Sequence, residues 1–570
     1  MRTFHVISAL LSLNSFASGS GINFSKMGRL VLPLDEGDMH ADLVAAAPVN
    51  TTGSAFFTQL LDHSDPSKGT FQQKYWWNSE YWAGPGSPVV IFTPGEDAAG
   101  SYGAFITNDT LPGLLAQEVK GAAILIEHRY WGESSPYPNL DAETLQFLTL
   151  KQAIGDFTHF AKTVALPFDT AHSSNSDNAP WVWSGGSYSG ALGAWIESTA
   201  PGTYWAYHAS SAPVQTLYDY WQWFTPIMEG MPKNCSSDIT KVIEYMDRVL
   251  QKGTAEEQLA LKTMFGLESV EHNADFMNVV GLAVYSWQGN SFTSGYSFFY
   301  QFCDAVENVA AGAAIVPDAN GVGLNKALVG YAKFVNETVI PGYCSGYNVT
   351  DERDTKCMNT YSPTDPVYSD HTVDNYAGLQ WLWMLCNEPL AGWQSGAPLH
   401  KTTIVSRLVT ADYRQQQCPL AFPTVHGFTY RPNISPNNDV HQVNKYTKGW
   451  RLENTTRLIW SNGQFDAWTS TSMSSAYREG GPFLGSATSP LQNIPGGFHG
   501  SDMRLRNAKA NADVQAVVDN EVAQIVKWVA EYYQKYQPSP EQHCTQEASK
   551  CVAPGSRTLA TIDHYNWQMA

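Results

Sequence analysis

The chain has 570 residues and a formal net charge of −19 at pH 7, and 43% of its residues are hydrophobic and 13% aromatic. This composition supplies a large core and excludes an intrinsically disordered chain. The negative charge argues against nucleic acid as a partner, because phosphate binding requires a basic face. The length predicts more than one domain, or one domain with a large insertion.

A secretory signal peptide is predicted over residues 1–19. Arg2 gives a basic start, the run Val6–Leu11 is apolar, and Ala17–Gly19 supplies small residues at the exit. No later apolar run reaches the roughly 18 residues that span a bilayer, so no membrane contact is predicted. Residues 20–48 carry little pattern and are interpreted as a pro-segment. We expect the mature chain to be secreted or to reach an acidic, vacuolar or lysosome-like compartment.

Sequons and cysteines agree with export. N-glycans are expected on the surface, because N-x-S/T sequons occur at Asn23, Asn50, Asn108, Asn234, Asn336, Asn348, Asn433 and Asn454. The eight cysteines show no zinc-site spacing, so disulfides are predicted and no metal. The sequence leaves their connectivity open, and our prediction is sequential pairing: Cys235–Cys303, Cys344–Cys357, Cys386–Cys418 and Cys544–Cys551.

The first half of the chain predicts a sheet. Residues 55–63 and 69–77 have the composition of an opening hairpin. Buried strands and one helix follow, with strands expected within 88–96, 121–133, 181–183 and 204–214 and a helix over 149–164. Apolar strands that alternate with helices indicate a parallel sheet covered on both faces. In such a sheet the active groups gather at the carboxyl ends of the strands.

The segment 217–449 differs in character. It is rich in Trp, Tyr and Cys, with helical patterns over 238–251 and 255–264, and we interpret it as a mainly helical cap domain. The sheet resumes over 456–463 and 491–495, and a long closing helix is predicted over 508–536. The sheet domain would then comprise residues 49–216 and 450–536, and residues 537–570 would form an appended tail.

Ser187 lies at the centre of the most informative stretch, Trp181–Trp195. An apolar run, a turn of small residues and a helix-compatible segment are typical of a nucleophile elbow, which raises a serine hydroxyl above a sheet. Gly185 fits the small position two before the serine. The position two after it holds Ser189, and Gly190 comes one residue late, so the simple G-x-S-x-G pattern is incomplete.

Two later residues are candidates for the partners that a nucleophilic serine needs. A base must take the proton of the serine and a third group must orient the base, in the chain order Ser, Asp or Glu, His. Asp466 and His499 each follow a predicted strand in that order, although each could equally be an ordinary loop residue. For the oxyanion hole, the N–H of Tyr188 is one expected donor, and the Gly95–Glu96 loop would supply the second.

The ordered motifs resemble a known family. Gly185–Tyr188, Glu127–Ser134, the loop of Asp466 and Trp468, and Gly497 with His499 are similar to the proline-specific serine peptidases, which include lysosomal Pro-Xaa carboxypeptidase and dipeptidyl peptidase II. The likeness runs from about residue 55 to 536 and is strongest to the fungal acid prolyl endopeptidases.

The resemblance implies an α/β-hydrolase fold whose inserted, disulfide-bearing helical cap covers a triad of Ser187, Asp466 and His499. It implies proline-containing peptide or protein substrates, cut after proline and sometimes alanine at acidic pH, without a cofactor. Trp468 would form an aromatic wall of the proline pocket, although any Trp can simply pack in a core. Ala467 and Gly500 depart from residues that are common in the family.

Some alternatives stay open at the level of sequence. Glu96 and Glu133 are interpreted first as ion-pair partners of Arg129, and second as groups that bind a substrate terminus. The chain could be an endopeptidase or an exopeptidase of the same family. An esterase on the same fold, or a binding protein on an inactive scaffold, are further alternatives, since fold does not fix function.

Overall fold

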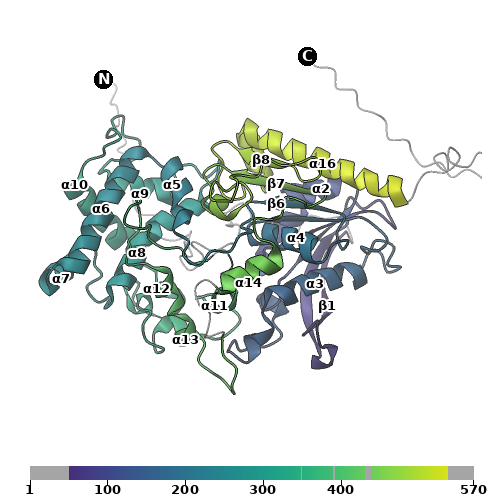
Figure 1. The fold of residues 1–570 in the computed structure, drawn as a ribbon, viewed down its shortest axis with the longest axis horizontal. Helices are drawn as coiled ribbons and strands as arrows, with labels where there is room; N and C mark the ends of the chain where they lie inside the picture. The colour runs from purple at the N-terminus through teal and green to yellow at the C-terminus, as the bar shows by residue number, and fades with distance from the viewer. Residues whose placement is uncertain (1–50, 348, 389, 391, 431–437, 537–570) are drawn as a thin grey trace, which may run out of the picture.

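A computed structural model describes residues 51–347, 349–388, 390, 392–430 and 438–536 (Figure 1). The predicted signal peptide, pro-segment and tail, and with them the Cys544–Cys551 pair, lie outside the described residues. The centre of the described part is an eight-stranded sheet in the order β1-β2-β4-β3-β5-β6-β7-β8. The strands are β1 Thr52–Leu60, β2 Thr70–Asn78, β3 Val89–Phe92, β4 Ala122–Ile126, β5 Trp181–Gly186, β6 Ala206–Ser210, β7 Leu458–Gly463 and β8 Leu491–Ile494.

The sheet is parallel where its strands are buried. β1 pairs antiparallel with β2, and β2 antiparallel with β4, while all pairs from β4 to β8 are parallel. Every residue of β3, β4, β5, β6 and β7 is buried, as expected for strands covered on both faces. This order of strands, with the serine turn after β5, is that of the α/β-hydrolase fold, which confirms the predicted fold class.

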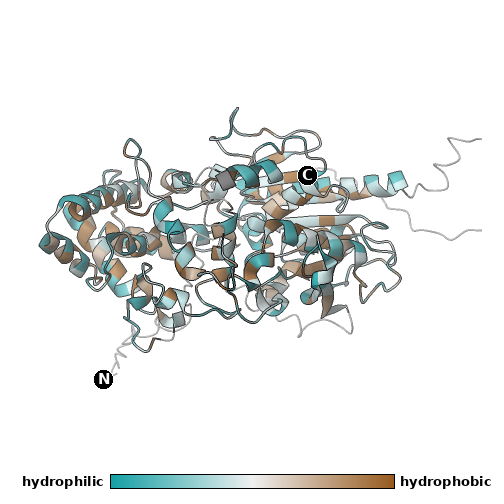
Figure 2. Cartoon of the chain, turned by 60° about the horizontal axis from the view of Figure 1, so that its bottom comes forward, coloured by the Kyte–Doolittle hydropathy of each residue, from teal (hydrophilic) through white to brown (hydrophobic). Residues whose placement is uncertain are grey.

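Helices cover the sheet on both sides (Figure 1). α2 (Leu111–Glu118) and α16 (Ala512–Tyr536) lie on one face, and α3 (Leu150–Thr163) and α4 (Tyr188–Thr199) on the other. Consecutive side chains of β3 enter opposite cores: Val89 and Ile91 pack with α3 and α4, whereas Val90 and Phe92 pack with α2 and α16. Figure 2 shows the same pattern, with hydrophobic segments inside and hydrophilic helix faces outside. None of the described helices is both long and apolar enough to cross a membrane.

The segment between β6 and β7 is helical. Its helices are α5 Thr225–Gly230, α6 Lys233–Lys252, α7 Ala255–Met264, α8 Asn273–Tyr285, α9 Phe298–Val306, α10 Leu324–Phe334, α11 Leu379–Asn387, α12 Ala411–Gln415, α13 Cys418–Ala421 and α14 Asn438–Thr447. Three disulfides connect it as predicted: Cys235–Cys303, Cys344–Cys357 and Cys386–Cys418. One hydrophobic cluster runs from this segment into the α3/α4 side of the sheet, so the segment and the sheet share a core.

The closing helix differs from its prediction. Instead of one helix from residue 508, the structure has α15 (Leu505–Ala510) followed by α16, with a break at Asn511. Asn511 is extended, with φ −143°, and its Oδ1 accepts hydrogen bonds from the N–H groups of Asp513 and Val514 at 2.9 and 3.1 Å. The asparagine therefore ends one helix and caps the next, which the apolar periodicity alone does not reveal.

Candidate active site

Ser187 occupies the turn between β5 and α4, with φ 61° and ψ −131°. A positive φ is strained for a side chain larger than glycine, and its N–H is held by the carbonyl of Ser210 at 2.9 Å. Two glycines near Ser187 allow α4 to pack closely against β5 and β6. A Cβ on Gly185 would lie 2.5 Å from Ser189 Oγ, and one on Gly190 would lie 2.9 Å from the carbonyl oxygen of Ser210 on β6. Gly190, one residue later than the simple motif expects, is therefore the glycine that lets α4 approach β6.

Three side chains from separate strand ends meet at this turn. His499 Nε2 lies 2.8 Å from Ser187 Oγ, and His499 Nδ1 lies 2.9 Å from Asp466 Oδ1. All three residues are buried, with exposed fractions of 0%, 5% and 1% for Ser187, His499 and Asp466. Asp466 begins the short 3₁₀ helix η12 (Ala467–Thr471), and its Oδ1 also accepts the N–H of Trp468 at 3.0 Å. The arrangement is that of a hydrogen-bonded Ser–His–Asp chain.

The loop that carries His499 is fixed to the sheet on its far side. Gly500, with φ 61°, donates its N–H to Ser211 Oγ at 2.9 Å. Asp502 accepts hydrogen bonds from the hydroxyls of Ser210 and, at 2.5 Å, Ser461, which end β6 and lie in β7. The positive φ explains why a glycine stands at position 500, since few other residues adopt this backbone conformation. No sequence motif predicted these hydrogen bonds.

Asp502 belongs to a buried ionic cluster with His208 and Glu521. His208 Nε2 lies 3.1 Å from Asp502 Oδ2 and 3.4 Å from Glu521 Oε1. Burial, reinforced by Asp502, raises the pKa of Glu521 to about 7. Burial works against a charge on His208, but Glu521 and Asp502 outweigh it and raise the pKa of His208 to about 10. Within the described part of the chain, these three residues are the group whose possible ligand atoms lie close enough together to hold a metal ion. The distances from His208 to the two carboxylates are also those of ion pairs within the protein.

The stability of the protein is expected to fall as the pH rises from 5 to 8. The native state binds the Glu521 proton more tightly than the unfolded state, so stability is lost between the ordinary pKa of 4.5 and about 7. His208 adds stability below its ordinary pKa of 6.5, and this is lost as the pH rises towards 10. Thermal unfolding across this range measures the effect. In Glu521→Gln the loss between pH 5 and 7 should shrink, by up to about 3 kcal/mol.

A suitable control for this prediction is Asp519→Asn, which changes an exposed acid on the same helix. Its pH profile should follow that of the wild type. A wild-type protein that is more stable at pH 8 than at pH 5 would contradict the prediction.

The candidate oxyanion donors lie beside the serine. Tyr188 is the first residue of α4, where backbone N–H groups lack partners within the helix. Gly95 has φ 80°, and a Cβ there would lie 2.7 Å from Tyr188 Cδ1, so the Gly95–Glu96 loop packs directly on Tyr188. The N–H of Gly95 donates to Thr93 Oγ1 at 3.3 Å, and Glu96, the next residue of the loop, is buried.

Arg129 has a partner other than the two predicted. Its Nε and Nη2 donate to Asp156 of α3 at 2.6 and 2.5 Å, and both side chains are buried. Glu133 instead pairs with Lys74 at 3.3 Å and is 62% exposed. Burial opposes the charge of Asp156, but Arg129 and His63 hold the pKa of its carboxyl below the ordinary value. The predicted Arg129–Glu133 pair is wrong, because Arg129 turns inward to α3 while Glu133 faces solvent.

Aromatic side chains surround the triad on one side. Trp468 is 2% exposed, and its ring lies 6.4 Å from that of His499 and 5.8 Å from those of Tyr220 and Trp223.

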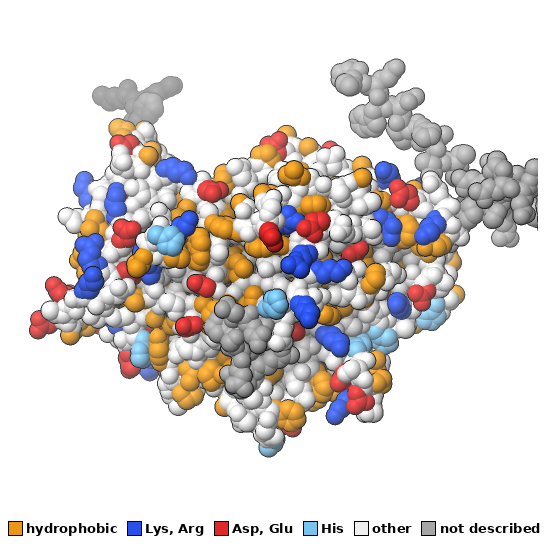
Figure 3. Space-filling view, viewed as in Figure 1, with side chains coloured by type: hydrophobic (Ala, Val, Ile, Leu, Met, Phe, Trp, Pro, Cys, Tyr) orange, Lys and Arg blue, Asp and Glu red, His pale blue; other side chains and the backbone are white. Residues whose placement is uncertain are grey.

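A separate hollow of about 1160 Å³ beside α14 is lined by charged residues that include Lys445, and it contains no triad residue. Figure 3 shows Lys and Arg side chains gathered near the middle of the visible face.

Three kinds of comparison relate the chain to known proteins. The sequence model of the family described as serine carboxypeptidase S28 matches residues 59–520. A serine protease of Bipolaris victoriae, vicPa, is 38% identical over 512 residues, which cover 88% of this chain and 94% of that protein. Lysosomal Pro-X carboxypeptidase of Bos taurus is 23% identical, over 84% of this chain and 88% of that protein. Among solved structures, a bacterial heroin esterase matches with a TM-score of 0.31 and 10% identity, covering 85% of this chain and 87% of that one. The chain therefore belongs to the serine carboxypeptidase S28 family and is a serine-type peptidase.

Proposed function

We propose that the protein is an exported peptidase that cleaves peptides on the carboxyl side of proline, in acidic surroundings, with Ser187 as the nucleophile, His499 as the base and Asp466 as the group that orients it. The observation that carries this proposal is the buried chain of contacts from Ser187 Oγ through His499 to Asp466, next to the indole of Trp468. The alternative of an inactive scaffold is disfavoured, because such proteins usually lose a member of the triad.

The proposal assigns a residue to each step of the reaction. Ser187 Oγ attacks the carbonyl carbon of the substrate while His499 Nε2 takes the hydroxyl proton. The contact of Nδ1 with Asp466 favours the tautomer whose Nε2 accepts that proton, and it stabilises the charged imidazolium. The N–H groups of Tyr188 and Glu96 would bind the oxyanion. His499 then protonates the departing amine, and water hydrolyses the acyl-enzyme by the same route.

The preference for proline rests on the aromatic side of the site. The pyrrolidine ring of a proline residue is apolar, has a fixed shape and lacks an N–H, so it suits a wall of flat indole and phenol rings. Trp468, Tyr220 and Trp223 provide such rings beside His499. The printed name of the bovine relative, a Pro-X carboxypeptidase, points in the same direction.

Acidic surroundings and export rest on other features. The buried carboxyls of Glu127 and Glu521 have pKa values raised to about 7 by burial, which suits a protein that works below that pH. The sequons at Asn108 and Asn454 are exposed, as N-glycosylation of an exported chain requires.

The test uses peptides blocked at both termini that carry Pro, Ala or Leu at one internal position, at about pH 4–5. We expect cleavage after Pro to exceed cleavage after Leu by roughly 10- to 200-fold, because one pocket contact supplies that much discrimination. Similar rates for all three peptides would contradict proline specificity. Cleavage of free-ended peptides only would identify an exopeptidase, and hydrolysis of a fatty-acyl ester without any peptide would identify an esterase.

A further inference from the structure

Two consecutive serines, Ser210 and Ser211, stand at the end of β6, between β5 and β7. In the register of the sheet, Ser210 lies level with Gly186 of β5 on one side and with Ser461 of β7 on the other. Ser210 and Ser211 are both buried, with exposed fractions of 0% and 1%. Buried hydroxyls need hydrogen-bond partners, and the partners of these two indicate what the serines do.

Ser210 contacts the turn of Ser187 with its backbone and the loop of His499 with its side chain. Its carbonyl oxygen accepts the N–H of Ser187 at 2.9 Å. Its hydroxyl donates to the carboxylate of Asp502, three residues after His499. A single residue of β6 is therefore bonded to both segments that form the contact between Ser187 and His499.

Ser211 holds the same loop one residue after His499. Its Oγ accepts the N–H of Gly500 at 2.9 Å. Within the loop, the hydroxyl of Ser501 accepts the N–H of Phe498 at 2.8 Å and donates to the carbonyl of Phe498 at 3.0 Å. Because the loop is closed by its own hydrogen bonds, its attachment to Ser211 fixes where the imidazole of His499 lies.

The backbone of Ser211 is strained. Its φ is 49°, in the left-handed region that is unfavourable for a residue with a Cβ and natural for glycine. The N–H of Ser211 donates to the carbonyl of Ser461 at 2.8 Å, which keeps this conformation in place. A glycine here would relieve the strain but would lack the hydroxyl that Gly500 contacts. Strain of this kind is found most often at functional sites.

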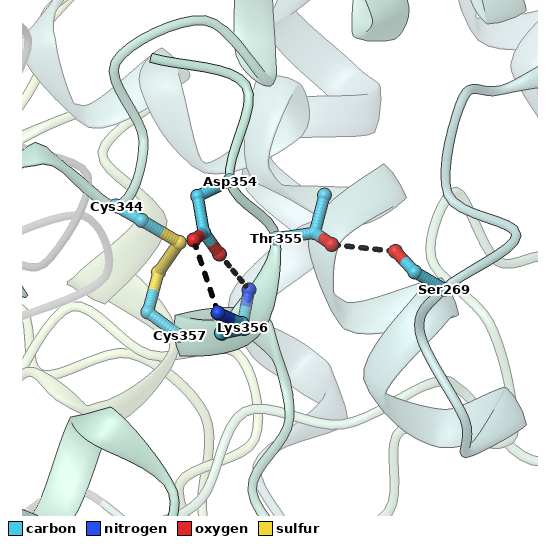
Figure 4. Close-up of a disulfide and its surroundings, with 6 residues drawn as sticks. All are labelled: Ser269, Cys344, Asp354, Thr355, Lys356 and Cys357. Carbon is cyan, nitrogen blue, oxygen red and sulfur yellow. Dashed lines mark hydrogen bonds and ion pairs between the residues drawn. A yellow bond between two sulfur atoms is a disulfide. The ribbon is translucent and has the colours of Figure 1, made fainter. Parts of the chain in front are cut away.

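No covalent cross-link can fix the turn of the nucleophile or the loop of the base. The sequence has no cysteine in residues 1–234 or 419–543, which include both segments. The helical segment differs, because the Cys344–Cys357 disulfide closes a loop there and the hydroxyls of Thr355 and Ser269 lie 2.5 Å apart beside it (Figure 4). Near the triad, hydrogen bonds have to provide the rigidity that a disulfide provides in that loop.

We propose that Ser210 and Ser211 are positioning residues that set the distance between Ser187 and His499. The inference rests on the proposed function and deepens it. The carbonyl of Ser210 holds the turn of the nucleophile, and the two hydroxyls hold the loop of the base from the same end of β6. In this arrangement neither serine touches the substrate. A displacement of about 1 Å costs roughly 100-fold in rate, so a small shift of the loop would mainly slow the chemical step.

The experiment separates activity from stability at position 211. Ser211→Gly and Ser211→Ala both remove the hydroxyl, but only glycine adopts the positive φ without strain. We expect kcat for a peptide substrate to fall about 10- to 100-fold in both variants, with KM within about twofold of the wild-type value. Thermal unfolding should rank the variants differently, with Ser211→Gly melting roughly 1–3 °C above Ser211→Ala.

Covalent labelling measures the same effect without a peptide. The rate of reaction with a saturating serine-reactive phosphonate depends on the activation of Ser187 by His499, so it should fall in both variants by about the same factor as kcat. Ser489→Ala is the matched control. The hydroxyl of Ser489 is also buried and accepts the indole N–H of Trp460 at 2.9 Å, but it precedes β8, whereas His499 follows that strand. This variant should lose stability and keep kcat within about twofold.

The outcomes separate this inference from the proposed function. An unchanged kcat in Ser211→Gly would overturn the positioning role. A loss of activity in Ser211→Ala that is absent in Ser211→Gly would overturn it as well, because activity would then follow backbone strain. Labelling of a residue other than Ser187 in the wild type would overturn the proposed nucleophile itself. Neither measurement depends on which residue precedes the cut, so the result holds for any substrate preference.

Discussion

Replacing Ser187 with alanine is expected to lower kcat/KM for peptide hydrolysis by roughly 10⁴- to 10⁶-fold. The hydroxyl is the group that His499 contacts at 2.8 Å, and alanine leaves the base without a nucleophile to activate. Substrate binding does not depend on that hydroxyl, so KM should change little. Steady-state kinetics with a proline peptide, checked by active-site labelling with a serine-reactive phosphonate, measures both effects.

Ser189→Ala is the matched control for this experiment. Ser189 lies two residues along the same turn, and its hydroxyl is buried without contact to His499. Its activity should stay within severalfold of wild type. Hydrolysis by Ser187→Ala at more than a hundredth of the wild-type rate would show that another group is the nucleophile.

Asp156→Ala is expected to lower the free energy of unfolding by about 3–5 kcal/mol, the largest stability effect that we expect from a single residue here. The substitution leaves Arg129, whose side chain is wholly buried, without a counter-charge. The remaining N–H groups of Arg129 donate to the carbonyls of Leu60, Leu61 and Phe147, so the arginine cannot turn to solvent without breaking them. Denaturant or thermal unfolding at one fixed pH measures the loss.

A surface ion pair provides the comparison. Lys333 and Glu337 lie 3.9 Å apart with side chains 69% and 63% exposed, so Glu337→Ala should cost no more than about 0.5 kcal/mol. Equal losses in the two variants would refute the structural role of Asp156. Because the pKa of Asp156 lies below its ordinary value, its stabilisation should be present at pH 5 and be lost only as the pH falls through that lowered pKa.

The features that the sequence predicted best are the side chains placed just after the ends of strands. Ser187, Asp466 and His499 each follow a predicted strand, and these strands are β5, β7 and β8 of one sheet. Parallel strands put their carboxyl ends at one edge, so three loops that are far apart in the chain could be expected to meet.

The sequence gives no comparable indication of which charged side chains pair in the core. The partner of Arg129 is an aspartate on the buried side of α3, and nothing in the spacing separates Asp156 from the glutamates nearer in sequence. The cluster of His208, Asp502 and Glu521 likewise joins three elements whose polar residues look ordinary one at a time. The inserted segment has even weaker patterning, because loops whose course the sequence does not specify connect its helices.

The connection between β6 and β7 has a consequence for how the enzyme is made. These neighbours pair in register, Tyr207 with Leu458, yet the whole helical segment is synthesised between them. Contacts between such distant residues form late, because the intervening chain must first be ordered. During synthesis the elbow with Ser187 emerges early, while the strands that bring Asp466 and His499 arrive last. In the proposed mechanism, the serine of a nascent chain therefore lacks its base until translation is nearly complete, which delays proteolytic activity until the rest of the molecule has been made.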